Sequence, residues 1–519
     1  DDLPPNITID DVTEAENADG FFDFTITLDA ASGNTVTVDY SLADGTATTT
    51  DGDYTSTAKE DDDTDASDAG DGDGTATFAA GATTIQLRAL VTGDTTDEAT
   101  ETFNVNLANA SFGTITDGTG VGTITTDDTA PTISIDDIAI TEGDSGDVAG
   151  TVTVTLSNAS DSTIAMTVAL ADDTATSADT DYSGTFTTSD ASPSDATLTF
   201  VAGETSHTIS VAATGDDKNE ASETFDVELS SASGGTNGTV AFAVAGGTTG
   251  PETGVVTVTN DDAVVLSIAA ASEPENQDGT LTFAVTIDAS TGTATTSGAD
   301  VTFNVTTSAG TATAGGTDYT TVPSSGATGT ISADGTSTNV TVAVTGDTIN
   351  EDDETFTVTL DTPGGGLDAT PTLNGAATSA TGTIENDDVL ALVISDDTST
   401  DESDGTLTFT VELETGAGMT SDADVSVDYT LTDGTAYVGA SPSGVGGSDY
   451  TAVGTDDDGG TAGTLTIEAG TFDGTIMVAF ADDSINEADE TFTVVLTNLT
   501  GGSGTGNDFS DATGLGTIL

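Results

Sequence analysis

The chain has 519 residues and a formal net charge of −88, with 91 Asp and Glu residues against 3 Lys and Arg residues. This balance excludes ordinary binding to the phosphates of nucleic acids, which needs cationic side chains, and it disfavours docking on an anionic membrane surface. The length predicts about three to five domains, and the charge predicts that the protein attracts cations.

The first predicted strands come from apolar residues at every second position. They are FFDFTITL (21–28), TVTVDYSL (35–42), TTIQLRAL (83–90) and TFNVNL (102–107). This period of two predicts half-buried antiparallel strands separated by Gly, Asp, Asn and Ser turns. The acidic insert at 59–74 lacks the alternation and is expected to be a long flexible loop. No stretch shows a sustained helical period or a transmembrane run.

Internal repetition continues the pattern along the chain. The acidic block GDTTDEATETFNVNL (93–107) returns at 215–229, 346–360 and 482–496. A second signature, GTITTDD (122–128), returns at 256–262 and 382–388. Four repeats are therefore predicted, at residues 1–126, 127–260, 261–386 and 387–519. The chain opens on an acidic pair and stops before the next one, so we expect a segment of a longer tandem array.

About seven short strands in about 130 residues favour a two-sheet Greek-key sandwich of immunoglobulin type. The predicted fold is all-β, with four such domains in an extended rod.

Four kinds of acidic position recur at matching places. One is a Glu after the first strand, another is an Asp in a DGTA or DDTA turn, the third kind forms the D-x3-E-x2-E block, and the last is the closing acidic pair. These candidate metal ligands are Glu14, Asp44, Asp94, Glu98, Glu101, Asp127, Asp128, Glu142, Asp172, Asp216, Glu220, Glu223, Asp261, Asp262, Glu273, Asp347, Glu351, Glu354, Asp387, Asp388, Glu402, Asp433, Asp482, Asp483, Glu487 and Glu490.

Loops and strand ends of a Greek-key sandwich can converge at one pole of the domain. Two like charges about 4 Å apart repel by roughly 4 kcal/mol at an effective dielectric constant of about 20, so converging carboxylates must protonate or gather a cation. Six to eight oxygen ligands suit Ca²⁺ better than Mg²⁺, which keeps its waters. Zn²⁺ would need His or Cys, and the chain has one His and no Cys.

Simpler readings compete with the metal site. An Asp-Gly pair is usually only a turn, and an acidic surface can serve solubility in a salt-loving organism. Solubility explains the net charge but not acids at fixed offsets. With one His and no Cys, a catalytic triad has no basis, and no acidic pair outside the repeats marks a hydrolytic cleft. We therefore expect no enzyme activity.

Taken together, the motifs resemble the Calx-beta domain. They are the Glu after strand one, DGTA followed by a DY pair such as Asp53-Tyr54, then DxxxExxETF and GTIxNDD. The resemblance covers all four repeats and implies seven-stranded sandwiches that hold Ca²⁺ at the pole facing the next domain. The third repeat departs from it, with SAGTAT (308–313) in place of DGTA, and the fourth lacks its closing NDD. Both sites are expected to be weaker or incomplete.

The function expected on this basis is that of a calcium-binding, extracellular structural or adhesive rod, part of a large bacterial surface protein, filament or matrix. Calcium would clamp the junctions between neighbouring repeats. Head-to-tail self-assembly into a filament is a variant of this hypothesis. Two alternatives stay open: regulatory calcium-sensor repeats of a membrane protein, and a carbohydrate-binding module.

Overall fold

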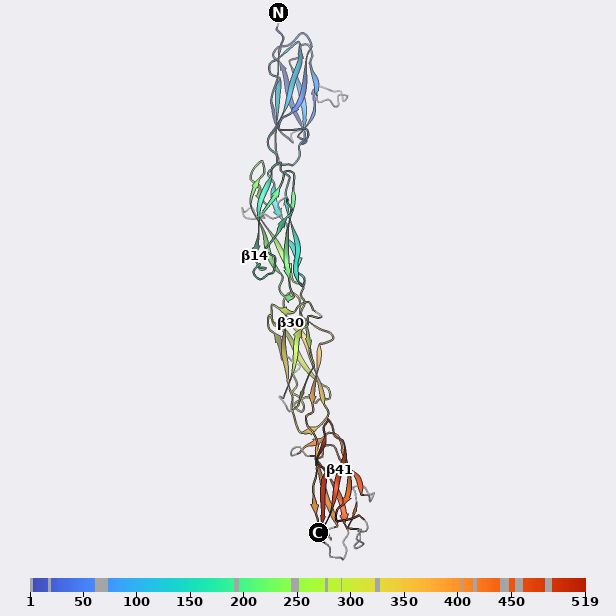
Figure 1. The fold of residues 1–519 in the computed structure, drawn as a ribbon. Coiled ribbons are helices and arrows are strands. Elements are labelled where there is room, and N and C mark those ends of the chain that lie inside the picture. Colours follow the sequence, from blue (N-terminus) through green and yellow to red (C-terminus); the bar gives the residue numbers. More distant parts are fainter. Residues whose placement is uncertain are drawn as a thin grey trace. The chain divides into compact units, whose positions relative to one another are not determined.

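The computed structural model describes residues 3–16, 20–60, 73–190, 196–243, 252–275, 279–290, 292–322, 327–401, 403, 405–413, 418–438, 448–452, 461–480 and 488–519. Over these residues the protein is all-β (Figure 1). None of the described residues forms a helix of the length and apolarity that crossing a membrane requires. The chain divides into two compact units, residues 1–216 with 221–261, and residues 217–220 with 262–519.

The first repeat, in the first unit, is a sandwich of two five-stranded sheets. Their strand orders are β5-β7-β3-β1-β9 and β2-β10-β8-β4-β6. The strands are β1 (Asn6–Ile9), β2 (Val12–Ala15), β3 (Phe21–Leu28), β4 (Val36–Asp44), β5 (Tyr54–Glu60), β6 (Asp73–Phe78), β7 (Thr84–Val91), β8 (Glu101–Ser111), β9 (Thr114–Ile115) and β10 (Thr119–Thr125).

The second repeat completes the first unit with the same two sheets, in the orders β15-β17-β13-β11-β20 and β12-β21-β19-β14-β16. Its strands are β11 (Thr132–Ile135), β12 (Ile138–Thr141), β13 (Gly146–Leu156), β14 (Ile164–Asp172), β15 (Thr187–Thr188), β16 (Thr197–Phe200), β17 (Ser206–Gly215), β19 (Glu223–Gly234), β20 (Ala241–Phe242) and β21 (Glu252–Thr259).

The second unit holds the third repeat, whose sheets are β28-β24-β22-β31 and β23-β32-β30-β26-β27, and the two-stranded sheet β18-β25. These strands are β18 (Lys218–Asn219), β22 (Val265–Ile268), β23 (Ala271–Pro274), β24 (Thr280–Ile287), β25 (Thr296–Ser297), β26 (Val301–Ala309), β27 (Ala327–Ile331), β28 (Ser337–Ala343), β30 (Glu354–Gly365), β31 (Thr372–Leu373) and β32 (Ser379–Glu385).

The fourth repeat, also in the second unit, has the sheets β38-β40-β35-β33-β42 and β34-β43-β41-β37-β39, and the pair β29-β36 lies beside them. The strands are β29 (Ile349–Asn350), β33 (Ala391–Ile394), β34 (Asp397–Thr398), β35 (Thr406–Leu413), β36 (Thr420–Ser421), β37 (Val425–Asp433), β38 (Tyr450–Ala452), β39 (Ala462–Ile467), β40 (Asp473–Phe480), β41 (Glu490–Gly501), β42 (Asp508–Asp511) and β43 (Thr513–Ile518).

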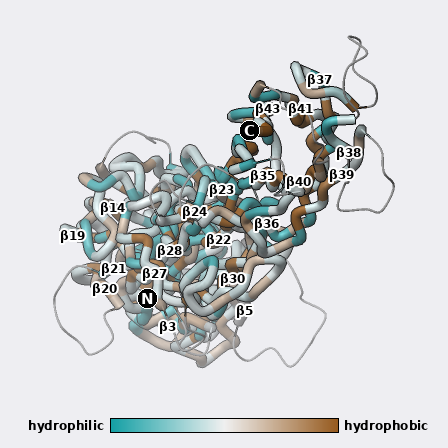
Figure 2. Tube along the Cα trace, turned by 90° about the horizontal axis from the view of Figure 1, so that it is seen from below, coloured by the Kyte–Doolittle hydropathy of each residue, from teal (hydrophilic) through white to brown (hydrophobic). Residues whose placement is uncertain are grey.

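Each repeat has its own hydrophobic core, made by the alternation seen in the sequence. In β3, for example, Phe22, Phe24 and Ile26 are fully buried while the residues between them are not. Figure 2 shows hydrophobic and hydrophilic residues following one another along the strands. A Tyr ring stacks on a Phe ring in every core, as Tyr54 does on Phe103 with centroids 4.6 Å apart.

The four strands predicted in the first repeat are confirmed by β3, β4, β7 and β8, with the same bounds for β3 and within four residues at each end for the others. The prediction of one loop over 59–74 is wrong at its ends. Strand β5 runs on to Glu60 and β6 begins at Asp73, because both continue the ladders of their neighbours β7 and β4. The residues in between lie outside the described part of the chain.

The second and last strands of each repeat lie side by side and parallel. Strand β2 pairs with β10 in this way, β12 with β21, β23 with β32, and β34 with β43. Parallel strands end at the same edge of a sheet. The residue that follows the first of these strands therefore meets the acidic pair that follows the last.

Candidate metal centre

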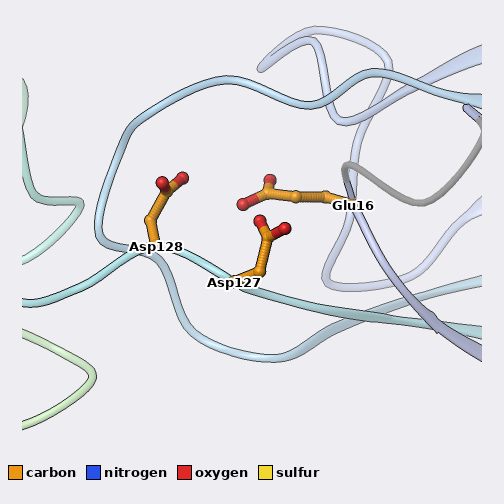
Figure 3. Close-up of side chains that lie close together, drawn as sticks. All are labelled: Glu16, Asp127 and Asp128. Atoms are coloured by element: carbon orange, nitrogen blue, oxygen red, sulfur yellow. The ribbon is translucent and has the colours of Figure 1, made fainter.

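A cluster of three carboxylates occupies this edge in the first unit. Glu16 follows β2, and Asp127 and Asp128 follow β10. One carboxylate oxygen of each lies within 4.8 Å of the others, and the three groups point into a common space (Figure 3). Glu16 is only 4% exposed. Burial, the Asp128 carboxyl group and the charges of Glu98 and Asp94 raise the pKa of Glu16 to about 7.

The acidic loop between β7 and β8 surrounds this cluster. Burial and the negative charge of Asp94 raise the pKa of Glu98 to about 7. Burial and a hydrogen bond with Asp53 do the same for Glu101. Burial, together with the repulsion between the carboxylates of this loop and of the cluster, therefore favours protonation of these glutamates near neutral pH.

The second unit contains a matching cluster. It joins Glu275, after β23, to Asp388, after β32, and to Asp347 of the next acidic loop, again with oxygens within 4.8 Å. Burial and the charges of Asp347 and Glu351 raise the pKa of Glu275 to about 7. Burial is also the largest cause at the two glutamates of the loop, followed by the charge of Asp347 at Glu351 and by Asp318 at Glu354. The pKa of Glu351 rises to about 7, and that of Glu354, hydrogen-bonded to Asp318, to about 8.

Several oxygens of the two clusters and of the adjoining acidic loop are buried and have no hydrogen-bond partner among the described residues. They are Asp128 Oδ2, Glu275 Oε1, Glu354 Oε2 and Asp388 Oδ2. A buried acceptor without a donor is costly, and a buried charge more so. A hard divalent cation bound by oxygens would remove both penalties. The donor set thus suits a metal ion of the Ca²⁺ type.

Each cluster is extended by an Asp from the loop of the following repeat. Asp161, before β14, accepts a hydrogen bond from the Ala99 amide at 3.3 Å and raises the pKa of Glu98. Asp422, before β37, contributes to the raised pKa of Glu351 in the same way. The sequence analysis missed both residues, although Ser-Asp precedes each strand at the same distance. The acidic centre therefore draws on two consecutive repeats.

The glutamates predicted after the first strand are not all in the clusters. Glu14 lies within β2 opposite Ile124, and Glu273 lies within β23 opposite Ile384. The cluster instead takes Glu16 and Glu275, two residues further on. In the second repeat Glu142 has this register, since its amide donates to Thr259 O as the Glu16 amide donates to Thr125 O. In the fourth repeat the pairing of β34 with β43 gives this position to Asp401 rather than Glu402.

The aspartates of the DGTA and DDTA turns each anchor a buried tyrosine. Asp44 accepts a hydrogen bond from the Tyr54 hydroxyl at 2.6 Å, Asp172 from Tyr182 at 2.6 Å and Asp433 from Tyr450 at 2.7 Å. Each also accepts the amide five residues on. Burial and the bond to Asp172 raise the pKa of Tyr182 to about 12. In the third repeat Ala309 takes this place, and the buried Tyr319 hydroxyl has no partner among the described residues.

The remaining candidates are placed as follows. Asp261 accepts a hydrogen bond from the Gly143 amide at 3.0 Å, beside the buried Glu142, and Glu220 forms an ion pair with Lys218 at 2.7 Å. Asp262 is buried, Asp216 is exposed, Glu223 and Glu490 begin β19 and β41, and Asp387 raises the pKa of Glu275. Glu402, Asp482, Asp483 and Glu487 lie outside the described residues.

Comparison with known proteins agrees with the repeat pattern. The Calx-beta domain model matches residues 2–137, 126–262, 259–388 and 384–513. No curated protein matches the chain.

Several solved structures also match. The crystal structure of CBD12 from CALX1.2 is 18% identical, over 49% of this chain and 99% of that one, with a TM-score of 0.22. The calcium binding domain CBD12 of CALX1.1 is 18% identical, over 45% and 79%, with a TM-score of 0.22. The titin domains z1z2 in complex with telethonin are 14% identical, over 50% and 98%, with a TM-score of 0.19.

Proposed function

The chain belongs to the Calx-beta domain family, of which it carries four tandem copies, and from this premise we propose that it is a calcium-binding structural repeat protein. Bound Ca²⁺ would fasten the acidic end of one repeat to the loops of the next. The role is mechanical and not catalytic.

The observation that carries the proposal is the pair of carboxylate clusters, each of which contains one buried Glu. Glu16 with Asp127 and Asp128, and Glu275 with Asp347 and Asp388, each bring three acids together. Lys and Arg number 3 against 91 acids, so protein cations cannot neutralise such clusters in general. A site at the end of one repeat that also includes Asp161 or Asp422 couples two repeats through one ion.

The residues of a junction would act through their charge. Without a cation, Glu98 and Asp94 repel the buried Glu16 and the loops tend to separate. A bound Ca²⁺ supplies positive charge and oxygen coordination at this point. At a concentration of about 100 times its dissociation constant it would add about 2.7 kcal/mol of stability per site.

We place this function outside the cell, at a cell surface or in an extracellular matrix or filament. Carboxylate sites at exposed module ends belong to the class with dissociation constants of roughly 10⁻⁴ to 10⁻³ M, which is useful where Ca²⁺ is abundant. The high negative charge also keeps such a protein soluble. Labelling of intact source cells with an antibody against the repeats tests the location. Labelling that requires permeabilised cells would refute it.

Titration calorimetry of the full chain tests calcium binding. We expect several sites in the wild type, and loss of at least one site in each of Glu16→Gln and Glu275→Gln, because each removes the buried carboxylate at the centre of a cluster. Glu14→Gln and Glu273→Gln are matched controls on the same strands and should bind like the wild type. Absence of Ca²⁺ binding, or equal effects of all four changes, would contradict the proposal.

A further inference from the structure

In the three acidic loops that the structure describes at this point, one residue is fully buried although its neighbours are charged. It is the residue just before the first Glu of the block, namely Asp97, Asn219 and Asn350, and all three are 0% exposed. We call these three the latch residues. None is among the proposed metal ligands. Their side chains are buried against the repeat that follows, and each set of contacts lies within a single compact unit.

The side chains of the latch residues contact the following repeat through hydrogen bonds. Asp97 Oδ2 accepts from the Thr236 amide at 2.9 Å and the Ser160 hydroxyl at 3.2 Å, and Asp97 Oδ1 accepts from the Asn237 amide at 3.0 Å.

Asn350 makes a related set. Its Oδ1 accepts from the Ser503 amide at 2.7 Å, and its Nδ2 donates to Asp388 O at 2.6 Å. Asn219, which belongs to the same unit as Asn350, accepts hydrogen bonds through its Oδ1 from the Leu367 amide at 2.8 Å and from the Ser297 hydroxyl at 3.1 Å.

The receiving surface is built the same way each time, and we call it the seat. It contains a serine four residues before a long strand, Ser160, Ser297 or Ser421, which pairs with the latch residue as parallel backbone. It also contains a Gly-Gly pair with positive φ, followed by the amide that the latch accepts, as at Gly501, Gly502 and Ser503.

Glycine is favoured in the seat because the backbone there has positive φ, which residues with a side chain rarely adopt, and the latch residue also lies near these glycines. A Cβ at Gly502 would lie 3.3 Å from Asn350 Oδ1, and one at Gly366 would lie 3.3 Å from Asn219 Oδ1. At Gly235 the distance to Asp97 Oδ2 would be 3.4 Å. The same φ and the same approach recur at three places, so the seat is a specific binding surface for one side chain.

From this geometry we infer a second fastening between consecutive repeats that needs no metal: the latch residue inserted into its seat. All of its bonds join protein groups, and opening it leaves buried donors and acceptors unpaired. It therefore stands independently of the proposed calcium role. Calcium would tighten a junction whose register the latch has already set.

The identity of the latch residue matches its seat. The seat of Asp97 offers it three donors, which suits a carboxylate. The junctions of Asn350 and Asn219 offer a donor and also a carbonyl acceptor, Asp388 O or Asp262 O, which suits an amide. An Asp at position 350 would place negative charge against Asp388 O. The latch thus specifies which repeats can be neighbours.

Hydrogen exchange of the full chain tests the inference at the peptide that contains Ser503. In the wild type we expect this peptide to stay protected in Ca²⁺ and in chelator. Asn350→Ala should speed its exchange about tenfold or more in both solutions, because the amide loses its acceptor. Asn350→Asp, which has the same size, should also speed it. Unchanged exchange of core peptides in β37 and β41 shows that the fourth repeat is folded in either variant.

Glu351→Gln is the adjacent control. It removes a carboxylate of the proposed metal centre and should leave the Ser503 peptide protected in chelator. The latch is refuted if chelator alone exposes this peptide as much as Asn350→Ala does. The matching of latch to seat is refuted if Asn350→Asp exchanges like the wild type. Failure of calcium binding alters neither result, so the two proposals fail separately.

Discussion

The hydroxyl of Tyr319 differs from those of its three counterparts in its hydrogen bonding. Tyr54, Tyr182 and Tyr450 donate to an aspartate, whereas Tyr319 has no acceptor among the described residues. The ring stacks on a phenylalanine in all four repeats. The hydrogen bond and the packing can therefore be separated by comparing repeats.

Replacing each of these tyrosines by phenylalanine should give unequal effects. Tyr54→Phe, Tyr182→Phe and Tyr450→Phe lose a hydrogen bond to a carboxylate and should destabilise their own repeat by about 1.5 kcal/mol. Tyr319→Phe removes an unsatisfied hydroxyl and should be neutral or stabilising. Hydrogen exchange of core peptides gives the free energy of opening for each repeat. A loss at Tyr319→Phe equal to that at Tyr54→Phe would contradict this account.

The buried glutamates predict how stability depends on pH. The folded-state pKa of Glu16, Glu98 and Glu101 is about 7, above their ordinary value. The folded state therefore holds protons that the unfolded state has lost, and this contribution to stability disappears as pH rises from about 4.5 to about 7.

Metal-free protein should accordingly become less stable across this range, as measured by thermal unfolding at several pH values. With saturating Ca²⁺ the decline should vanish, and calcium affinity should fall on acidification because protons compete for the same oxygens. If the stability of the metal-free protein instead rises between about pH 5 and about pH 7, the pKa values of these carboxyl groups are not raised in the folded state.

The elements were predicted better than the contacts between them. Strands such as β3 and β8 follow from alternating apolar residues, because one face of each is buried. Glu14 and Glu16 are only two residues apart in the sequence. The parallel register of β2 on β10 is what selects Glu16 as the member of the cluster. Predicting Asp161 and Asp422 would have required the contacts between consecutive repeats, and the periodicity of the sequence does not encode those contacts.

Strand β18 carries Lys218, one of the 3 Lys and Arg residues of the chain. We therefore expect the stability of its pairing with β25 to depend on salt concentration. Lys218 Nζ lies 2.7 Å from Glu220 and 3.3 Å from Asp334. Lys218→Gln should weaken the pairing of β18 with β25 by about 0.2 to 1 kcal/mol, seen as faster exchange of the Gly298 amide, which donates to Asn219 O.

This difference should shrink in about 1 M salt, where exposed charges are screened. The β29–β36 pair has Ile349 at the equivalent position and serves as the control, with exchange that is not changed by Lys218→Gln. A Lys218→Gln effect that persists at high salt would mean that the ion pair is not its cause.

Over the whole molecule, the first repeat differs from the others in the surface that corresponds to a seat. Ser32 corresponds to Ser160, because the carbonyl of each accepts a hydrogen bond from a glycine amide. However, Gly113 is followed at once by β9, whereas five residues separate Gly235 from β20. The part of the seat that supplies the amide of Thr236 is therefore missing.

Head-to-tail assembly of copies of this 519-residue chain would have to use this incomplete surface. We predict that the protein stays monomeric in saturating Ca²⁺, as measured by sedimentation velocity. Inserting residues 236–240 after Gly113 should raise self-association, and inserting five residues in the β6–β7 turn should not. Calcium-dependent polymers of the wild type would show that assembly does not need the latch.

The parallel pairing of each repeat's second and last strands has a consequence for mechanical load. If the two ends of a repeat are pulled apart, β2 and β10 slide along each other in opposite directions, and the bonds from Val12 to Ala15 are sheared together instead of opening one by one. The topology that gathers the carboxylates also places them at the end of this sheared pair. Cation binding there would raise the force at which a repeat yields.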